Sequence, residues 1–94
     1  NRESRVIAME IREAQRLIRD AYYIRDSTRG LYPTFTWLVE EVGELAEALL
    51  SGKKDDIEEE IADVLAWLLS VANLLDVDVE EAFKKKYVEK GPPK

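Results

Sequence analysis

Two stretches, EEVGELAEALL (residues 40–50) and EEIADVLAWLL (residues 59–69), repeat one pattern along the chain. Each has two acids three residues apart, Glu41 and Glu44 in the first stretch, Glu60 and Asp63 in the second. Each also has apolar residues at the three- and four-residue spacing of an amphipathic helix. The repeat predicts two similar helices that pack through their apolar faces and carry matching acidic pairs.

The same helical spacing extends to both sides of the repeat, and no segment has the alternation of a strand. We expect an all-α fold: an antiparallel helical bundle of three long helices plus a short C-terminal helix, completed by dimerisation. Thr34 or Thr36 is expected to cap the second helix. We expect one domain over residues 1–94, with flexible ends at 1–4 and 88–94. The expected helices cover about 6–24, 34–50, 55–75 and 79–87.

The chain has 94 residues, no Cys and no His. This composition excludes disulfide scaffolds, zinc fingers and Cys or His nucleophiles, and it argues against a di-iron bundle built from Glu-x-x-His pairs. A domain this small buries enough surface for only marginal stability, and oligomerisation is a usual remedy. We therefore expect at least a homodimer.

The net charge of −6 conceals a strongly acidic centre. Residues 31–83 have two Lys against fourteen acids, whereas both flanking segments carry a net positive charge. Nucleic-acid binding needs a basic face, so we expect no nucleic-acid partner. The acidic centre suits either a divalent cation with phosphates around it or a solvated surface.

The chain has no run of eighteen apolar residues that would span a membrane. Its charged N-terminal segment has no apolar signal-peptide core. We expect a cytoplasmic protein with no membrane partner.

At 100° per residue, both helices of the repeat place an acid at the edge of the apolar arc. The matching flanks carry Trp37, Glu41 and Glu44 on one helix and Glu60, Asp63 and Trp67 on the other. Four carboxylates can then meet, and such groups repel one another unless a cation lies between them. Oxygen ligands without His or Cys favour Mg²⁺ or Mn²⁺. The arcs expected in the core are Phe35, Leu38, Val42, Leu45, Ala46 and Leu49, and Ile57, Ile61, Val64, Leu65, Leu68, Ala72 and Leu75.

Each of these features also has a purely structural interpretation. A single acidic pair on a helix is typical of a solvated face, although two copies at matching positions weaken that explanation. Trp37 and Trp67 are typical of core or interface packing. The run Lys84-Lys85-Lys86 suits either a helix C-terminus, where cations complement the dipole, or a phosphate contact.

The acids and their surroundings resemble the EExxE…ExxD signature of the MazG-type, all-α nucleoside triphosphate pyrophosphohydrolases. Helix two of that family is similar to residues 35–47, FTWLVEEVGELAE, and helix three to residues 60–67, EIADVLAW. The resemblance covers about residues 7–87, including the Asp26-x-x-Arg29-Gly30 turn and Lys86-Tyr87. The tail after Tyr87 departs from the pattern, because it lacks both a Cys-Pro-x-x-Cys-like segment and an Asn and Arg after the Lys.

The resemblance implies hydrolysis of a (d)NTP between its α- and β-phosphates to a nucleoside monophosphate and pyrophosphate. It implies that Glu41, Glu44, Glu60 and Asp63 are the catalytic Mg²⁺ ligands, with Glu40 behind them or on the surface. One of these acids would accept a proton from the attacking water. Lys86 is the first candidate for a phosphate contact, followed by Lys85, Arg25 and Arg29. Trp37, Trp67 and Tyr87 are candidates for stacking on the base.

Three functions remain open from the sequence. The first is a (d)NTP pyrophosphohydrolase that depends on Mg²⁺, or alternatively on Mn²⁺. It would remove unwanted nucleotides from the nucleotide pool. The second is a related carboxylate-bundle enzyme acting on dUTP or phosphoribosyl-ATP. The third is a catalytically silent helical dimerisation module.

Overall fold

The computed structural model describes residues 8–91, and every regular element in that range is helical. The elements are α1 (Ile11–Arg29), α2 (Leu31–Ser51), α3 (Lys54–Leu74), α4 (Val79–Phe83) and a π-helical segment, η2 (Lys84–Glu89). The all-α prediction is confirmed, with three long helices and a short C-terminal one. Flexible ends are expected at 1–4 and 88–94, of which 1–4 and 92–94 lie outside the described residues. Residues 88 and 89 are instead helical, because the helix expected to end at Tyr87 continues through Glu89.

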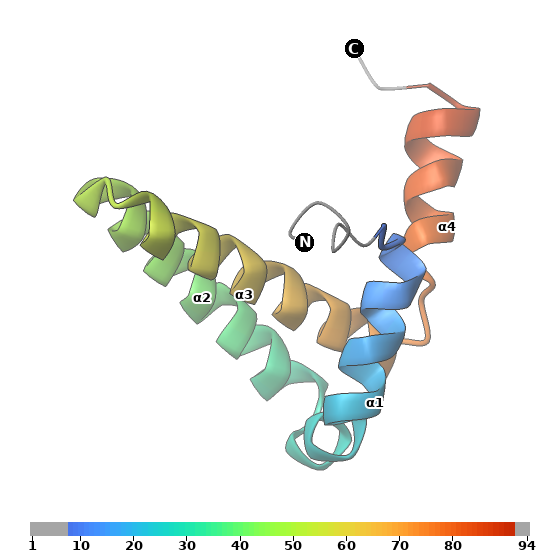
Figure 1. The fold of residues 1–94 in the computed structure, drawn as a ribbon. Helices are drawn as coiled ribbons and strands as arrows, with labels where there is room; N and C mark the ends of the chain where they lie inside the picture. Colours follow the sequence, from blue (N-terminus) through green and yellow to red (C-terminus); the bar gives the residue numbers. More distant parts are fainter. Residues whose placement is uncertain (1–7, 92–94) are drawn as a thin grey trace, which may run out of the picture.

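Helices α2 and α3 form an antiparallel hairpin, and their packing is the most extensive in the chain. Gly52 ends α2 in the left-handed conformation, with φ of 75°, and its N–H donates to the carbonyl of Ala48. Glycine adopts this conformation without steric cost, so the chain can reverse there. Helix α1 crosses the C-terminal part of α3, and α4 turns away from the hairpin (Figure 1).

A single residue, Gly30, separates α1 from α2. Its φ of 100° is open to glycine and strained for other residues, and its N–H donates to the carbonyl of Asp26. The helix break expected over residues 26–30 is therefore reduced to one residue. The expected cap at Thr34 or Thr36 is wrong, because α2 begins at Leu31 and neither hydroxyl caps it.

The face of α2 that meets α3 differs from the apolar arc expected from the helical wheel. One series of buried or half-buried side chains recurs at a three- and four-residue spacing on both helices. It comprises Thr34, Leu38, Glu41, Leu45 and Ala48 on α2 and Ile57, Glu60, Val64, Trp67 and Val71 on α3, whereas the most buried residues of α3 are Leu69, Ser70, Ala72 and Asn73. Glu41 and Glu60 therefore belong to the packing seam itself, whereas the wheel placed them at its border.

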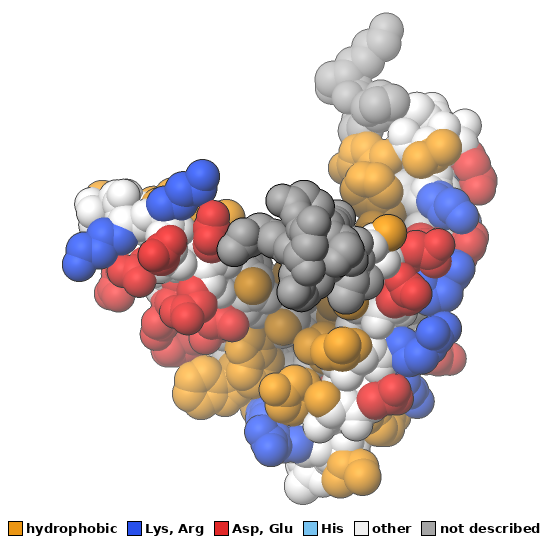
Figure 2. Space-filling view, viewed as in Figure 1, with side chains coloured by type: hydrophobic (Ala, Val, Ile, Leu, Met, Phe, Trp, Pro, Cys, Tyr) orange, Lys and Arg blue, Asp and Glu red, His pale blue; other side chains and the backbone are white. Residues whose placement is uncertain are grey.

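Much of the expected core is exposed in the single chain. Among residues 8–91, the buried hydrophobic residues are few: Leu38, Ala48, Leu69 and Ala72. On α2, Phe35, Val42 and Leu49 are about half exposed, at 50, 49 and 58%. Ile61 and Leu65 of α3 are similar, at 53 and 48%. Figure 2 shows hydrophobic side chains gathered on the face between the hairpin and α1.

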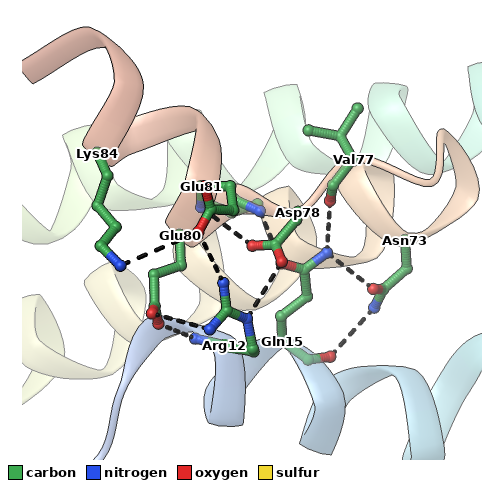
Figure 3. A network of polar contacts seen from close by, with 9 residues as sticks. Arg12, Gln15, Asn73, Val77, Asp78, Glu80, Glu81 and Lys84 are labelled. Atoms are coloured by element: carbon green, nitrogen blue, oxygen red, sulfur yellow. Dashed lines mark hydrogen bonds and ion pairs between the residues drawn. The ribbon is translucent and has the colours of Figure 1, made fainter. Parts of the chain in front are cut away.

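A polar network fixes the start of α4 against α1 (Figure 3). The side-chain amide of Gln15 donates to Asn73 Oδ1 at 3.0 Å and to the Val77 carbonyl at 2.7 Å. Its oxygen accepts the N–H of Val79 at 2.9 Å, which satisfies a donor in the first turn of α4.

Arg12 completes the network by pairing with three acids at the start of α4, Asp78, Glu80 and Glu81. The N–H of Glu81 donates to Asp78, and together with Arg12 it lowers the pKa of that carboxyl group. No helix among residues 8–91 is long and apolar enough to cross a membrane.

We predict that Gln15→Ala lowers the free energy of unfolding by about 2 kcal/mol, because it removes three hydrogen bonds and leaves part-buried partners unsatisfied. Arg16→Ala, an exposed neighbour on the same helix, should change it by less than about 0.5 kcal/mol. Urea denaturation of both variants measures the difference. Equal stability of the two variants would show that the network does not hold α4 in place.

Candidate metal-binding site

Three carboxylates from the two halves of the hairpin meet in the seam between α2 and α3. Glu41 comes from α2, and Glu60 and Asp63 come from α3. One oxygen of each lies within 4.8 Å of an oxygen of the other two. The antiparallel packing causes this convergence, because it brings the middle of one acidic stretch against the middle of the other.

Glu41 and Glu60 each have a buried oxygen, Oε1, that has no hydrogen-bond partner among residues 8–91. Ionised carboxylates only accept hydrogen bonds, so neither can satisfy the other. A buried polar atom without a partner costs free energy, and neighbouring negative charges add repulsion. The arrangement is favourable only when a proton or a cation lies among the three groups.

The pKa of Glu41 reflects the same unfavourable surroundings. Burial, together with a hydrogen bond shared with Glu60 and repulsion from nearby acids including Asp63 and Glu44, raises the pKa of Glu41 from 4.5 to about 7. At neutral pH, Glu41 is therefore partly protonated in the metal-free chain.

The residues present fit a hard divalent cation. All donors are carboxylate oxygens, which are typical ligands of Mg²⁺ and Mn²⁺. The two unsatisfied oxygens point to a ligand that residues 8–91 do not supply. Asp63 is exposed, so one side of the cluster is open to solvent and to a substrate.

The other two acids of the leading stretch lie differently. Glu44 is exposed and is not among the three converging carboxylates, although its charge contributes to the raised pKa of Glu41. Glu40 is also exposed. Three of the four expected ligands are thus brought together, and the participation of Glu44 stays a prediction.

An aromatic pair lies one helical turn from the carboxylates. Trp37 precedes Glu41 by four residues and Trp67 follows Asp63 by four, so antiparallel packing brings the rings together. Their centroids are 6.2 Å apart with an interplanar angle of 22°. Trp37 remains 49% exposed.

Arg29 lies beside the aromatic pair rather than free in solvent. Its guanidinium is 5.1 Å from the centre of the Trp67 ring. Nη1 donates to Asp26 Oδ1 at 2.8 Å and to Thr34 Oγ1 at 3.3 Å. Sequence reasoning missed Asp26 and Thr34 as partners. The i, i+3 spacing of Asp26 and Arg29 was the available signal for the ion pair, whereas nothing in the sequence places Thr34 beside it.

The C-terminal candidates are not brought to the carboxylates within one chain. Lys85, Lys86 and Tyr87 belong to η2, which continues directly from α4 and stands away from the hairpin (Figure 1). Tyr87 instead lies against Phe83, with ring centroids 5.0 Å apart, and Lys86 lies over the Tyr87 ring. Arg25 is exposed on α1 and lies over Tyr22.

The fold and the carboxylate cluster together define an all-helical protein with an acidic, oxygen-only candidate metal site. Comparison with known families agrees: residues 32–92, more than half of the chain, match the MazG nucleotide pyrophosphohydrolase domain. The chain belongs to this family. No curated protein matches it.

The raised pKa of Glu41 predicts a pH dependence of stability in the metal-free protein. The folded chain binds this proton more tightly than the unfolded chain, in which the pKa is near 4.5. The stabilisation that protonated Glu41 contributes to the free energy of unfolding is therefore fully present below about pH 4.5 and is lost as the pH rises through about 7. Glu41→Gln stays neutral and should gain stability relative to the wild type over that range.

Urea denaturation with EDTA between pH 4.5 and pH 8 measures this difference. Added Mg²⁺ at pH 8 should stabilise the wild type, by about 2.7 kcal/mol at one hundred times its dissociation constant, and should stabilise Glu41→Gln less. A stability difference that stays constant with pH would contradict the crowded environment assigned to Glu41.

Proposed function

We propose that the protein is a Mg²⁺-dependent (d)NTP pyrophosphohydrolase, with Mn²⁺ as an alternative metal. It would cleave between the α- and β-phosphates to release a nucleoside monophosphate and pyrophosphate, as a housecleaning enzyme of the nucleotide pool. The observation that carries the proposal is the convergence of Glu41, Glu60 and Asp63 with two buried, unsatisfied oxygens. Membership of a nucleotide pyrophosphohydrolase family supports it.

The carboxylates of the seam would hold the cation, with Glu44 as the fourth ligand. When bound, Mg²⁺ would neutralise the triphosphate, orient it and lower the pKa of a water molecule. The acids have a second role in this proposal, because a carboxylate beside the open side of the cluster can accept a proton from the attacking water. Phosphoryl-type transition states are stabilised mainly by positioning and charge, which a rigid seam provides.

The substrate's phosphates need cationic partners, and the chain offers Lys86 and Lys85 on its C-terminal arm, the helical segment formed by α4 and η2 (residues 79–89). The arm stands away from the hairpin in a single chain (Figure 1). We therefore propose that these lysines, and Tyr87, approach the substrate of a second copy. This arrangement would explain why they are exposed and directed away from their own carboxylates.

A second copy would also cover the apolar face left open by the single chain. Phe35, Val42 and Leu49 on α2, and Ile61 and Leu65 on α3, are about half exposed. Monomeric proteins rarely expose such extensive apolar surface. We propose a homodimer, or a homotetramer built from it, that packs through this face.

Sedimentation equilibrium tests the oligomer. The wild type should have twice or four times the mass of one chain, and Ile61→Asp should shift it toward the monomer, because a charge would be buried in the interface. Arg16→Asp, a charge change at an exposed position of α1, should leave the mass unchanged. A wild type that sediments as a monomer at every concentration would refute the interface.

The activity is tested by pyrophosphate release from a panel of (d)NTPs, dUTP and phosphoribosyl-ATP with Mg²⁺ or Mn²⁺. We expect release from at least one (d)NTP. Glu60→Gln and Asp63→Asn should lower kcat/KM by about 100-fold or more, on the scale of losing one charge-stabilising group from an active site. Glu44→Gln should also be impaired if Glu44 is a ligand.

The matched control is Glu59→Gln, which removes an exposed acid adjacent to Glu60 and should retain activity. Release from dUTP or phosphoribosyl-ATP alone would favour the related enzymes. No release from any substrate, together with unchanged Mg²⁺ binding in the variants, would identify a silent dimerisation module.

A further inference from the structure

The C-terminal arm is attached to the rest of the described chain at its base. Val79 and Glu80 are partly buried, whereas every residue from 81 to 90 is exposed. Phe83 and Tyr87 pair with each other within the arm. Beyond the arm, α1 is the main helix that α4 contacts (Figure 1). The direction of the arm therefore depends on the contacts made where it begins.

The length of the arm makes this direction important for the lysines proposed to contact phosphate. Lys85 and Lys86 lie six and seven residues beyond Val79. At a distance of roughly 10 Å from the base, a tilt of about 20° moves a residue by roughly 3.5 Å, which is longer than a hydrogen bond. The contacts at the base thus decide whether the lysines can reach a given phosphate.

Gln15 of α1 joins three parts of the chain at this base (Figure 3). Its amide nitrogen donates to Asn73 at the end of α3 and to the carbonyl of Val77 in the following loop. Its amide oxygen accepts the N–H of Val79, the first residue of α4. Asn73 is buried and donates in return to the backbone carbonyl of Gln15 at 3.3 Å. One side chain therefore uses both donors and its acceptor to fix where α4 starts.

Arg12, one turn before Gln15, fixes the angle at which α4 leaves. Its guanidinium contacts Asp78 at 3.1 Å, Glu80 at 3.2 Å and Glu81 at 3.3 Å. The Glu80 carboxylate also accepts the backbone N–H of Arg12 at 2.9 Å, so it bridges the first turn of α1 and the guanidinium. A guanidinium is planar and its donors have fixed directions, so contacts to successive residues of one helix restrict how that helix can tilt.

We propose that Arg12 and Gln15 are positioning residues for phosphate binding: they set the direction of the C-terminal arm and thereby the location of Lys85 and Lys86. The inference rests on the proposed function, in which these lysines meet the phosphates of a nucleotide bound by a second copy. It gives a role in substrate binding to a network that contains none of the carboxylates of the candidate metal site.

The direction of the arm can be measured without substrate or metal. The chain has no Cys, so Asp20→Cys on α1 and Glu89→Cys at the end of the arm provide two unique labelling sites, both at exposed positions. Spin-labelled chains are diluted into excess unlabelled protein, so that double electron–electron resonance reports the distance within one chain. We expect one narrow distance distribution in the otherwise unchanged protein.

Gln15→Ala and Arg12→Gln should each broaden this distribution or shift it by at least about 3 Å, on the scale of the tilt considered above. Arg16→Gln, a substitution at an exposed position of the same helix, should leave it unchanged. Arg12→Gln is the second route, because its ion pairs are partly exposed and the chain should fold without them even if Gln15→Ala does not.

The consequence for phosphate binding is measured by calorimetry with inorganic pyrophosphate and Mg²⁺, which requires no turnover. Gln15→Ala should weaken pyrophosphate binding at least about fivefold, and Arg12→Gln should act in the same direction. Arg12→Lys keeps a cation opposite the same acids and should recover part of the affinity. For the substrate found active in the panel, Gln15→Ala should raise KM at least about fivefold and change kcat less than about threefold.

A double-mutant cycle separates positioning from a merely structural role. In a protein that already carries Lys85→Ala and Lys86→Ala, Gln15→Ala should change pyrophosphate affinity less than about twofold, because no lysine is left to displace. If Gln15 only supported the fold, the same substitution would weaken binding equally with and without the two lysines.

Three results would overturn the inference. They are an arm distance that is the same in the wild type and both variants, no pyrophosphate binding or an affinity that neither variant lowers, and an equal effect of Gln15→Ala with and without the lysines. Lysine-dependent weakening in a protein that releases no pyrophosphate from any substrate would support the inference and refute the proposed function. Pyrophosphate release by a protein whose arm and pyrophosphate affinity are unaffected by the variants would do the reverse.

Discussion

The structure depends on one crowded contact, the approach of Glu41 and Glu60 across the seam between α2 and α3. Both residues occupy packing positions that a helix hairpin normally gives to apolar side chains, and each has a buried oxygen without a hydrogen-bond partner in the described part of the chain. Helices that carry acids into their seam lose stability unless something positive lies between them. The hairpin therefore combines the structural core and the candidate site in one contact.

This contact explains how the surrounding elements are arranged. The aromatic pair lies one turn from the acids, with Trp67 in the seam and Trp37 about half exposed beside it, and Arg29 lies over Trp67 at the α1–α2 corner. The single-residue turn at Gly30 places the end of α1 close to the start of α2. Asp26, Arg29 and Thr34 can therefore meet, and α1 can form one wall of a pocket that Asp63 also lines.

The sequence predicted three long helices and a short C-terminal one, and three of the four acids it paired lie close together, because both depend on local spacing. It failed where side chains from different helices decide the outcome. The wheel treated Phe35, Val42 and Ile61 as core, although they are about half exposed in one chain, and it placed Glu41 and Glu60 at the border of the seam. Hydrophobicity alone assigns the apolar side of a helix to the core, and it cannot distinguish the seam within a chain from an apolar face that stays exposed. The partners of Arg29 were missed for the same reason, since Thr34 is matched to it only by the sharp turn at Gly30.

The central claim is that the buried acids of the seam exist to hold a divalent cation. Diffraction from crystals soaked in Mn²⁺, recorded at the manganese absorption edge, tests it most directly. We predict an anomalous peak among the carboxylates of Glu41, Glu60 and Asp63, with Glu44 turned toward it. A protein that hydrolyses a nucleoside triphosphate with Mn²⁺, but whose crystals show the manganese bound elsewhere and none at these three residues, would contradict the account.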